Sequence, residues 1–325
     1  MSDVFADVAR QALKAYSLAD APCLLLQHSE NVTFKVNAGH EARLLRIHSP
    51  RSAFMGKHGA DAKMVNSEMV WLEALRRETD LPVQQPIMND QSQFVTTITQ
   101  GKRKFNCTLL EWLEGEPYRR ELENEQSAAQ LGALVGMLHQ FSKTWQTPAG
   151  FMRPKRDVAY FRKTMETLKP ATEDGRISYR DFKSLETAID LLTQMMGLIR
   201  KKNRMEGLLH GDLHKGNFIV HQGQIRLIDF SMSATGSYLF DLGVSLSDMN
   251  LMLHPVFLEE YQKYTSLPPN YARLIEGFFL AGMVMTFSYW LELPEAQEEL
   301  VHEVSLVARE YATKFNRDER FWFPV

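Results

Sequence analysis

Residues 207–231 read GLLHGDLHKGNFIVHQGQIRLIDFS, a short non-helical stretch between long helical patterns. The stretch contains His210-x-Asp212-x-x-x-x-Asn217, and Asp229-Phe230 follows twelve residues after the asparagine. Between these polar groups, strand-like apolar runs on either side of Gln222-Gly223 predict a β-hairpin. Such a hairpin would bring the Asp212 loop beside the strand end that carries Asp229.

These residue types suit phosphoryl transfer. One carboxylate, here Asp212, can orient an acceptor hydroxyl and take its proton, while the amide oxygen of Asn217 and the carboxylate of Asp229 offer the hard oxygen ligands that Mg²⁺ prefers. The protein-kinase catalytic loop, H-R-D-x-x-x-x-N followed by D-F-G, has the same skeleton. The motifs G-x-G-x-x-G and G-x-x-x-x-G-K-[ST] are absent from the sequence, which argues against a Rossmann dehydrogenase and a P-loop NTPase.

The chain resembles the aminoglycoside phosphotransferase family, a group with a protein-kinase-like fold that includes homoserine kinases of the second type and choline kinases. The resemblance rests on HGDLHKGN at 210–217, with Gly211 in place of the kinase arginine, and on IDF followed by Phe240-Asp241-Leu242-Gly243. It covers nearly the whole chain. It implies a bilobal α+β fold with a small antiparallel-sheet N-lobe and a larger, mostly helical C-lobe.

The resemblance also implies residue roles. Asp212 corresponds to the catalytic base, and Asn217 and Asp229 correspond to the two magnesium ligands. His210 corresponds to a residue that supports the loop. Asp241 corresponds to a buried carboxylate that accepts hydrogen bonds from the loop backbone; a carboxylate in the first turn of a helix, which the helix dipole favours, is a compatible interpretation.

Hydrophobic periodicity predicts the lobes on either side of residues 113–117. Residues 1–113 are expected to form the nucleotide-binding lobe, and 114–325 the helical lobe with the catalytic loop and the acceptor site. The N-lobe elements are expected to be a helix over 4–18, strands over 23–26, 33–36 and 42–47, a helix over 64–79 and a hairpin over 94–112. The C-lobe helices are expected at 126–145, 157–169, 181–202, 239–252, 255–265, 270–291 and 294–315.

The N-lobe should supply a cation for the nucleotide phosphates. Arg46 lies on the third strand where the kinase motif V-A-I-K has its lysine, and a guanidinium can grip phosphate oxygens in a bidentate manner. Arg43 is the competing candidate, but its odd separation from Arg46 turns it to the other face of the sheet, taken to be solvent. Glu68, on the following helix, is the predicted partner of Arg46.

Two further nucleotide contacts are predicted in this lobe. The turn His28–Thr33 resembles the phosphate loop of the family, in which Asn31 and backbone N–H groups would contact phosphates; a plain polar turn is the alternative. The segment Leu110–Gly115 resembles the kinase hinge, where the C=O of Glu111 and the N–H of Leu113 would bind adenine.

Composition is consistent with a cytoplasmic globular protein. The chain has 325 residues and a net charge of −3, which gives no basic excess for nucleic acid. Its two cysteines, Cys23 and Cys107, are expected to be free buried thiols in a reducing compartment. The N-terminus is not a signal peptide, and the apolar window 277–291 is shorter than the ~20 residues of a membrane span.

Cues to the acceptor conflict. Residues 259–310 hold nine Glu against three Lys or Arg, a balance that would attract a cation, although Glu-rich helix faces are usually just solvated. Within this segment Phe287, Tyr289 and Trp290 could cover a quaternary ammonium by cation–π contact, although aromatic residues in an apolar run usually belong to the core. Residues 153–169 are instead basic and would suit an anionic or peptide acceptor. The acceptor, whether aminoglycoside-, homoserine- or choline-like, therefore stays open, as does the oligomeric state.

The function expected is ATP- and Mg²⁺-dependent transfer of the γ-phosphoryl group to a small-molecule hydroxyl. One alternative is a protein Ser/Thr kinase, disfavoured because no A-P-E segment follows Asp229-Phe230 and Asp241 comes too soon for a long activation loop. The other is a catalytically silent nucleotide-binding protein, disfavoured by the intact Asp212, Asn217 and Asp229.

Overall fold

The computed structural model describes residues 2–28, 31–50, 60–199 and 205–323. The chain forms two compact units, and neither is continuous in sequence. The first comprises Met1–Pro117, Gln146–Arg153 and Phe218–Met232. The second comprises Tyr118–Trp145, Pro154–Asn217 and Ser233–Val325.

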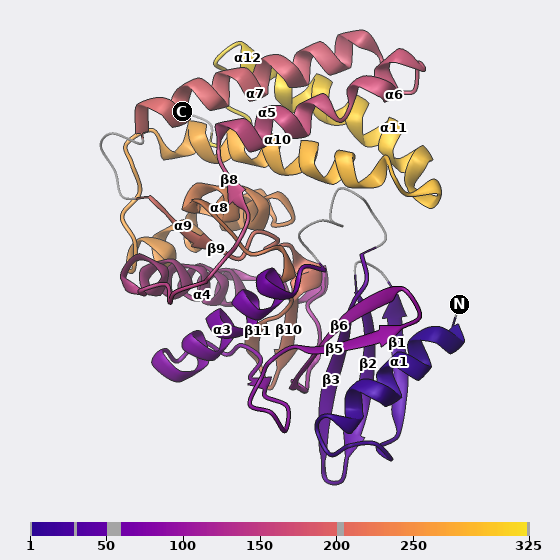
Figure 1. Ribbon diagram of the computed structural model, residues 1–325. Coiled ribbons are helices and arrows are strands. Elements are labelled where there is room, and N and C mark those ends of the chain that lie inside the picture. The colour runs from indigo at the N-terminus through magenta and orange to yellow at the C-terminus, as the bar shows by residue number, and fades with distance from the viewer. Residues whose placement is uncertain (1, 29–30, 51–59, 200–204, 324–325) are drawn as a thin grey trace. The chain divides into compact units, whose positions relative to one another are not determined.

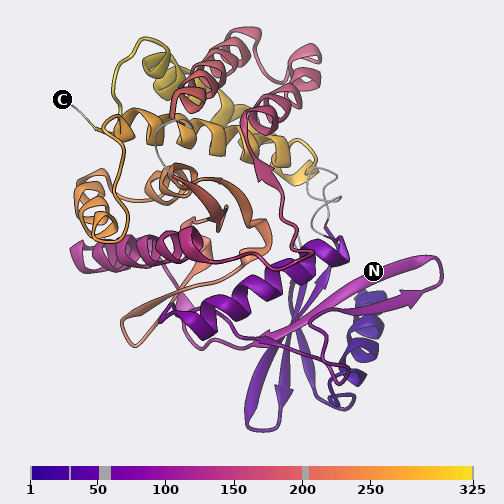
Figure 2. The same ribbon diagram turned by 60° about the vertical axis from the view of Figure 1, so that its left-hand side comes forward.

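An antiparallel sheet forms the centre of the first unit. Its strands lie in the order β1-β2-β3-β6-β4, and β5 pairs with β6. The strands are β1 (Cys23–His28), β2 (Val32–Ala38), β3 (Glu41–His48), β4 (Pro86–Ile87), β5 (Thr96–Gln100) and β6 (Arg103–Glu111). Helix α1 (Ser2–Lys14) lies against this sheet (Figures 1 and 2) and shares one buried apolar core with β2, β3 and β6.

Helix α3 (Ala62–Glu78) is the second helix of this unit among the described residues. The Asp61 side chain caps it by accepting hydrogen bonds from the N–H groups of Lys63 and Met64, which satisfies donors that the first helical turn leaves free. Its buried face contains mostly apolar residues, but Glu68 lies among them.

A smaller sheet completes the first unit. Strands β10 (Phe218–His221) and β11 (Gln224–Leu227) form the hairpin predicted around Gln222-Gly223, and β7 (Glu116–Pro117) pairs with β10. Gly115, just before β7, permits this pairing: a Cβ there would lie 2.8 Å from the carbonyl oxygen of Val220. The chain then turns through the 3-10 helix η3 (Phe230–Met232).

The second unit is mostly helical, with the apolar helix α10 (Tyr271–Trp290) deeply buried in it. The other α-helices are α4 (Glu125–Thr144), α5 (Val158–Glu166), α6 (Lys169–Glu173), α7 (Tyr179–Ile199), α8 (Tyr238–Ser247), α9 (His254–Gln262), α11 (Gln297–Leu306) and α12 (Thr313–Asn316). The short strands β8 (Lys155–Arg156), β12 (Ala234–Ser237) and β9 (Glu206–Leu209) form a sheet in that order.

The Gly132–Gly136 pair on α4 serves close helix packing, as its spacing predicts. A Cβ at Gly132 would lie 2.2 Å from the carbonyl oxygen of Phe257 on α9. The two helices therefore approach each other backbone to backbone, at a distance that only glycine allows.

Three sequence predictions need correction here. The helix expected over 157–169 ends at Glu166, and a new helix with Pro170 in its first turn begins at Lys169, because proline fits the start of a helix but not its interior. The helix expected over 294–315 is instead a 3-10 turn, α11, a π-helical segment over Val307–Ala312 and α12. Strands β9 and β12 were not anticipated in the sequence.

The α+β class, with a small antiparallel-sheet part and a larger helical part, is confirmed. Within the described ranges no helix is long and apolar enough to cross a membrane. Both cysteines are free; Cys107 is buried as predicted, whereas Cys23 is only half-buried.

Candidate active site

The predicted catalytic loop lies in the second unit, and buried side chains hold its backbone. The Asp241 carboxylate, on the first turn of α8, accepts hydrogen bonds from the N–H of His210 (2.9 Å) and the N–H of Gly211 (2.8 Å). On the other side of the loop, the Arg156 guanidinium donates to the Gly211 carbonyl at 2.6 Å. His210 and Asp241 are fully buried. Both peptide groups of Gly211 are therefore fixed immediately before Asp212.

The Asp212 side chain is one-third exposed, in contrast to the residues that hold the loop. The Asn217 amide donates to the Asp212 backbone carbonyl at 2.8 Å and to its Oδ2 at 2.9 Å. His214 Nε2 lies 3.4 Å from the same oxygen. Asp212 is thus a positioned carboxylate with access to solvent, which is what a base that meets an acceptor hydroxyl requires.

The orientation of Asn217 bears on metal binding. Because its amide nitrogen donates to Asp212, its amide oxygen points away from that carboxylate and remains an acceptor. An amide oxygen of this kind is a hard ligand suited to Mg²⁺. Among the described residues there is no group of three or more His, Cys, Asp or Glu side chains suited to a metal.

A buried ion cluster in the first unit brings together three predicted residues. The Arg46 guanidinium, on β3, donates to the Glu68 carboxylate of α3 at 2.6 Å and lies 3.7 Å from the Asp229 carboxylate. Arg46 and Glu68 are almost fully buried, whereas the Asp229 side chain is 37% exposed. Burial alone would lower the pKa of Arg46, but the two carboxylates outweigh burial and raise it, so the guanidinium stays charged.

Asp229 adopts a backbone conformation rare for a residue with a side chain, with a φ of 60°. Its carboxylate accepts a hydrogen bond from the N–H of Ser231 at 3.3 Å, and the Phe230 ring packs edge-on against Trp71 of α3, 5.5 Å between centroids. Strained backbone of this kind persists where surrounding contacts enforce it, and it often marks functional sites.

Arg153 is a residue of this cluster that the sequence did not reveal. Its guanidinium donates to the Met64 carbonyl at the start of α3 (2.9 Å) and to the Ser231 carbonyl (2.6 Å). It therefore ties α3, which carries Glu68, to the segment that carries Asp229. Arg153 and Arg156 stand at the start of the basic segment 153–169, and both use their guanidinium groups on backbone carbonyls.

The rival cation, Arg43, has a different environment. Its guanidinium pairs with Glu41 of the same strand, and its side chain is 25% exposed. The Arg43 side chain is therefore more exposed than that of Arg46, which is 3% exposed.

The other predicted nucleotide contacts also lie in the first unit. Asn31 is buried, whereas Ser29 and Glu30 of the same turn lie outside the described residues. At the hinge, the Glu111 carbonyl accepts a hydrogen bond from the Gln84 side chain at 3.1 Å; a carbonyl has two lone pairs, so it can still accept another. Leu113 is half-buried and lies just beyond β6.

The aromatic and acidic residues considered for acceptor binding differ in how deeply they are buried. Phe287 is fully buried in α10 and cannot line an open cage, while Tyr289 and Trp290 are half-buried. Glu276 is also fully buried, and its carboxylate accepts the N–H groups of Phe321 and Trp322. Part of the acidic balance of 259–310 is therefore structural.

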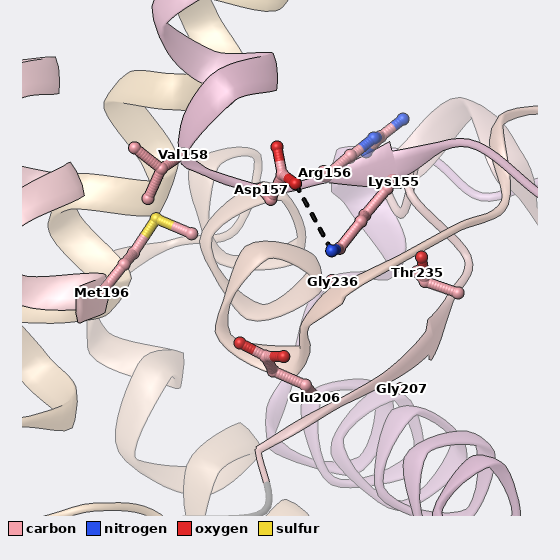
Figure 3. Close-up of a pocket in the computed structure, with 9 residues that line it drawn as sticks. All are labelled: Lys155, Arg156, Asp157, Val158, Met196, Glu206, Gly207, Thr235 and Gly236. Carbon is pink, nitrogen blue, oxygen red and sulfur yellow. Dashed lines mark ion pairs between the residues drawn. The ribbon is translucent and has the colours of Figure 1, made fainter. Parts of the chain in front are cut away.

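Figure 3 shows a separate cavity of about 190 Å³ in the second unit, beside the β8-β12-β9 sheet. Lys155 and Asp157, which line it, form an ion pair with 3.5 Å between their charged atoms; Figure 3 shows Glu206 below this pair and Met196 to its left. None of the predicted site residues lines it.

Comparisons with known proteins place the chain in a family. The phosphotransferase enzyme family matches residues 24–276, and the chain belongs to this family. The amicoumacin kinase of Bacillus subtilis (strain 168) is 23% identical over 291 residues, which cover 83% of this chain and 80% of that protein. The methylthioribose kinase of Yersinia pestis (strain Pestoides F) is 33% identical, but only over 92 residues, 28% of this chain and 21% of that protein.

Solved structures agree on the fold. A microcompartment-associated aminopropanol kinase superposes with a TM-score of 0.80 at 21% identity, covering 98% of this chain and all of that chain. An amicoumacin kinase in complex with AMP-PNP, Ca²⁺ and Ami has a TM-score of 0.74 at 18% identity over 96% of this chain and 93% of that chain. The protein-kinase-like fold and the suspected family are thereby confirmed, and the chain is an ATP-dependent phosphotransferase that acts on a small-molecule hydroxyl.

Proposed function

We propose that this enzyme uses Mg²⁺-ATP to phosphorylate the hydroxyl of a small alcohol that carries an amine. The observation that carries the proposal is the Asp212 carboxylate, which is partly exposed while Asn217 orients it and Asp241 and Arg156 fix the backbone before it. In this role Asp212 accepts the proton of the acceptor hydroxyl as the oxygen attacks the γ-phosphorus.

The nucleotide end of the reaction is assigned to the first unit. Arg46, held by Glu68, would bind the nucleotide phosphates, Asn31 would contact them, and the backbone of Glu111 and Leu113 would bind adenine. Magnesium, when bound, neutralises charge on the phosphates. Its protein ligands would be Asn217 and Asp229, whose amide and carboxylate oxygens are of the hard kind that Mg²⁺ prefers. We assign the N-terminal lobe to residues 1–113 and the acceptor-binding lobe to 114–325.

The amine preference rests on charge and on relatives. Residues 259–310 hold nine Glu against three Lys or Arg. Glu276 is buried and structural, but the remaining Glu residues would concentrate cations near this part of the surface. One structural relative is named for an amino alcohol, aminopropanol. We also infer that the protein works in the cytoplasm, where ATP and reduced thiols such as Cys23 and Cys107 are found, and that its partner is a small molecule, not nucleic acid or membrane.

The test is a matched pair of acceptors. ADP formation with Mg²⁺-ATP is measured for 1-amino-2-propanol against 1,2-propanediol, and for choline, homoserine and kanamycin, with phosphorus NMR to identify the phosphate ester. We expect a higher kcat/KM for the amine of the matched pair. Equal values would contradict the amine preference, and no ester with any acceptor would contradict the proposed function.

Asp212→Asn is the control for the assignment of the base. The substitution keeps the shape and removes the proton acceptor, so kcat should fall by about 10²–10⁴-fold, as expected for loss of general-base catalysis, while ATP binding stays nearly intact. A variant with the wild-type kcat would remove Asp212 from the mechanism.

A further inference from the structure

Residues 146–153 join α4 to β8 in sequence, yet they belong to the first unit. The end of this segment is fastened to α3 at two points. The Met152 N–H donates to the Ser67 hydroxyl at 2.9 Å, and Nη1 of the half-buried Arg153 donates to the Met64 carbonyl at 2.9 Å. Both bonds fall in the first half of the helix, next to the Glu68 carboxylate.

The Met64 carbonyl is part of the helical turn that carries Glu68. In an α-helix the N–H of each residue bonds to the carbonyl four residues earlier, so this carbonyl is the partner of the Glu68 N–H. A carbonyl oxygen has two lone pairs and can accept from Arg153 as well. Arg153 therefore fixes the turn from which Glu68 reaches Arg46.

The other arm of Arg153 fixes the turn that follows Asp229. Its Nη2 donates to the Ser231 carbonyl at 2.6 Å and lies 3.5 Å from the Phe230 carbonyl oxygen. Asp229 has a φ of 60°, a conformation that costs free energy and persists only where neighbouring contacts enforce it. Because a guanidinium is planar and rigid, its two arms set the separation between α3 and this turn.

We propose that Arg153 is a positioning residue for Mg²⁺-ATP, which holds the Arg46–Glu68 pair and the Asp229 carboxylate at a fixed separation. The proposal rests on the roles proposed above for Arg46 and Asp229. In protein kinases the ion pair of the phosphate-binding cation and the metal-binding aspartate must both be in place for phosphoryl transfer. Here one side chain bonds to the two backbone segments that carry these groups, so without Arg153 each segment moves independently of the other.

Two substitutions of Arg153 separate bridging from charge. Arg153→Met keeps an unbranched apolar stem and removes every donor. Arg153→Lys keeps the positive charge but offers a single nitrogen where the guanidinium offers two in a fixed geometry. If the charge alone matters, the lysine variant is normal; if the bridge matters, it is impaired, though less than the methionine variant.

Ser67→Ala is the matched control. It removes the other bond between the same segment and the same helix, the one from Met152, and leaves both arms of Arg153 in place. The variant should lose stability, because the Met152 N–H loses its acceptor, but its affinity for Mg²⁺-ATP should match that of the wild type.

The experiment measures ATP affinity by calorimetry with Mg²⁺ and with EDTA, together with hydrogen–deuterium exchange of residues 227–233, in the wild type and the three variants. We expect Arg153→Met to weaken Mg²⁺-ATP binding by about 10–100-fold, the range for losing a group that orients a metal ligand. Binding of metal-free ATP should weaken less, and exchange at 227–233 should become faster. Arg153→Lys should lie between the wild type and Arg153→Met.

Equal losses of affinity with and without Mg²⁺ in Arg153→Met would overturn the proposal, since a residue that only supports the fold predicts them. Unchanged exchange at 227–233 or a lysine variant equal to the wild type would overturn it too. If the wild type binds ATP equally well with and without Mg²⁺, the proposed metal role of Asp229 fails. The exchange data then still decide whether Arg153 holds the Asp229 turn, because they need no nucleotide.

Discussion

Arg46 contributes to the stability of the folded protein and is also the proposed ligand of the nucleotide phosphates. It is a permanently charged group in a buried position, and it is stable there because the Glu68 carboxylate carries the opposite charge and accepts a hydrogen bond from it at 2.6 Å. Removing one member of such a pair leaves the other charge buried without compensation, which typically costs about 3–5 kcal/mol. Activity and folding are therefore coupled at this residue.

Substitutions at Arg46 test its proposed contact with the phosphates. Arg46→Ala should raise KM for ATP and lower kcat, because the same contact stabilises charge in the transition state. Arg46→Lys should recover part of both, and Glu68→Gln should give a milder defect, since the guanidinium stays charged but loses its anchor. Steady-state kinetics with thermal melting separates lost binding from unfolding. Arg43→Ala is the control and should change little; a crippled Arg43→Ala beside a normal, stable Arg46→Ala would reverse the assignment.

Asp229 and Asn217 differ in the charge that they would give to a magnesium ion. Asp229→Ala removes a negatively charged ligand. It should therefore weaken Mg²⁺-ATP binding more than the loss of a residue that only hydrogen-bonds a metal ligand, which typically lowers affinity by about 10–100-fold. Asn217→Ala should weaken binding less, since a neutral ligand contributes less charge. Isothermal titration calorimetry gives both affinities; an unchanged affinity in Asp229→Ala would exclude this carboxylate as a ligand.

At the scale of the elements, the close packing of α4 against α9 requires a glycine at position 132. At Gly132 the obstacle to a Cβ is backbone, the Phe257 carbonyl, and backbone cannot move aside as a flexible side chain can. The consequence is that α9 must shift relative to α4 if the glycine is replaced.

Gly132→Ala should therefore destabilise the protein by about 1–3 kcal/mol, the cost of overpacking, although alanine favours a helix. Gly197→Ala, in α7, is the control: among the described residues no atom outside its own helical backbone lies within 4 Å of its Cβ position, so the higher helix propensity of alanine should raise stability by up to about 1 kcal/mol. Urea denaturation measures both; equal effects of the two substitutions would show that α4 and α9 do not pack this closely.

The elements also show what the sequence could and could not reveal. The Asp212–Asn217 loop and the hairpin before Asp229 are local patterns, so their spacing was sufficient to predict them. Strand β12 pairs with β9 and with β8, which are distant in sequence. Its own sequence has no alternation of apolar and polar residues that would predict a strand. The role of Arg153 depends on which elements pack together, so nothing in its local sequence distinguishes it from a surface residue.

For the molecule as a whole, buried neutral histidines make stability depend on pH. Burial lowers the pKa of both His139 and His254 below the usual 6.5. Above the pKa of the unfolded chain both states hold neutral histidines, and stability is not reduced. As the pH falls below that pKa, the unfolded chain binds protons that the buried histidines of the folded chain do not, so the free energy of unfolding decreases.

The free energy of unfolding should hence fall below about pH 6.5, by up to about 1.4 kcal/mol per pH unit for each histidine. Urea denaturation at pH 8, 7, 6 and 5.5 measures the slope. His254→Gln should reduce the slope of the free energy of unfolding against pH by the contribution of one histidine. A stability that is flat or rises over this acidic range would contradict the assigned protonation states.

The order in which the chain is made imposes a constraint on how the first unit can form. Its sheet is translated first, yet Gln146–Arg153 and Phe218–Met232 belong to the same unit. On the ribosome, the unit is complete only after the chain has been synthesised through Arg153 and Asp229, and Asp229 lies 118 residues beyond Glu111, where β6 ends. A gene cut after residue 113 would therefore encode an unfinished unit, and recombination could exchange neither unit as a single block of sequence.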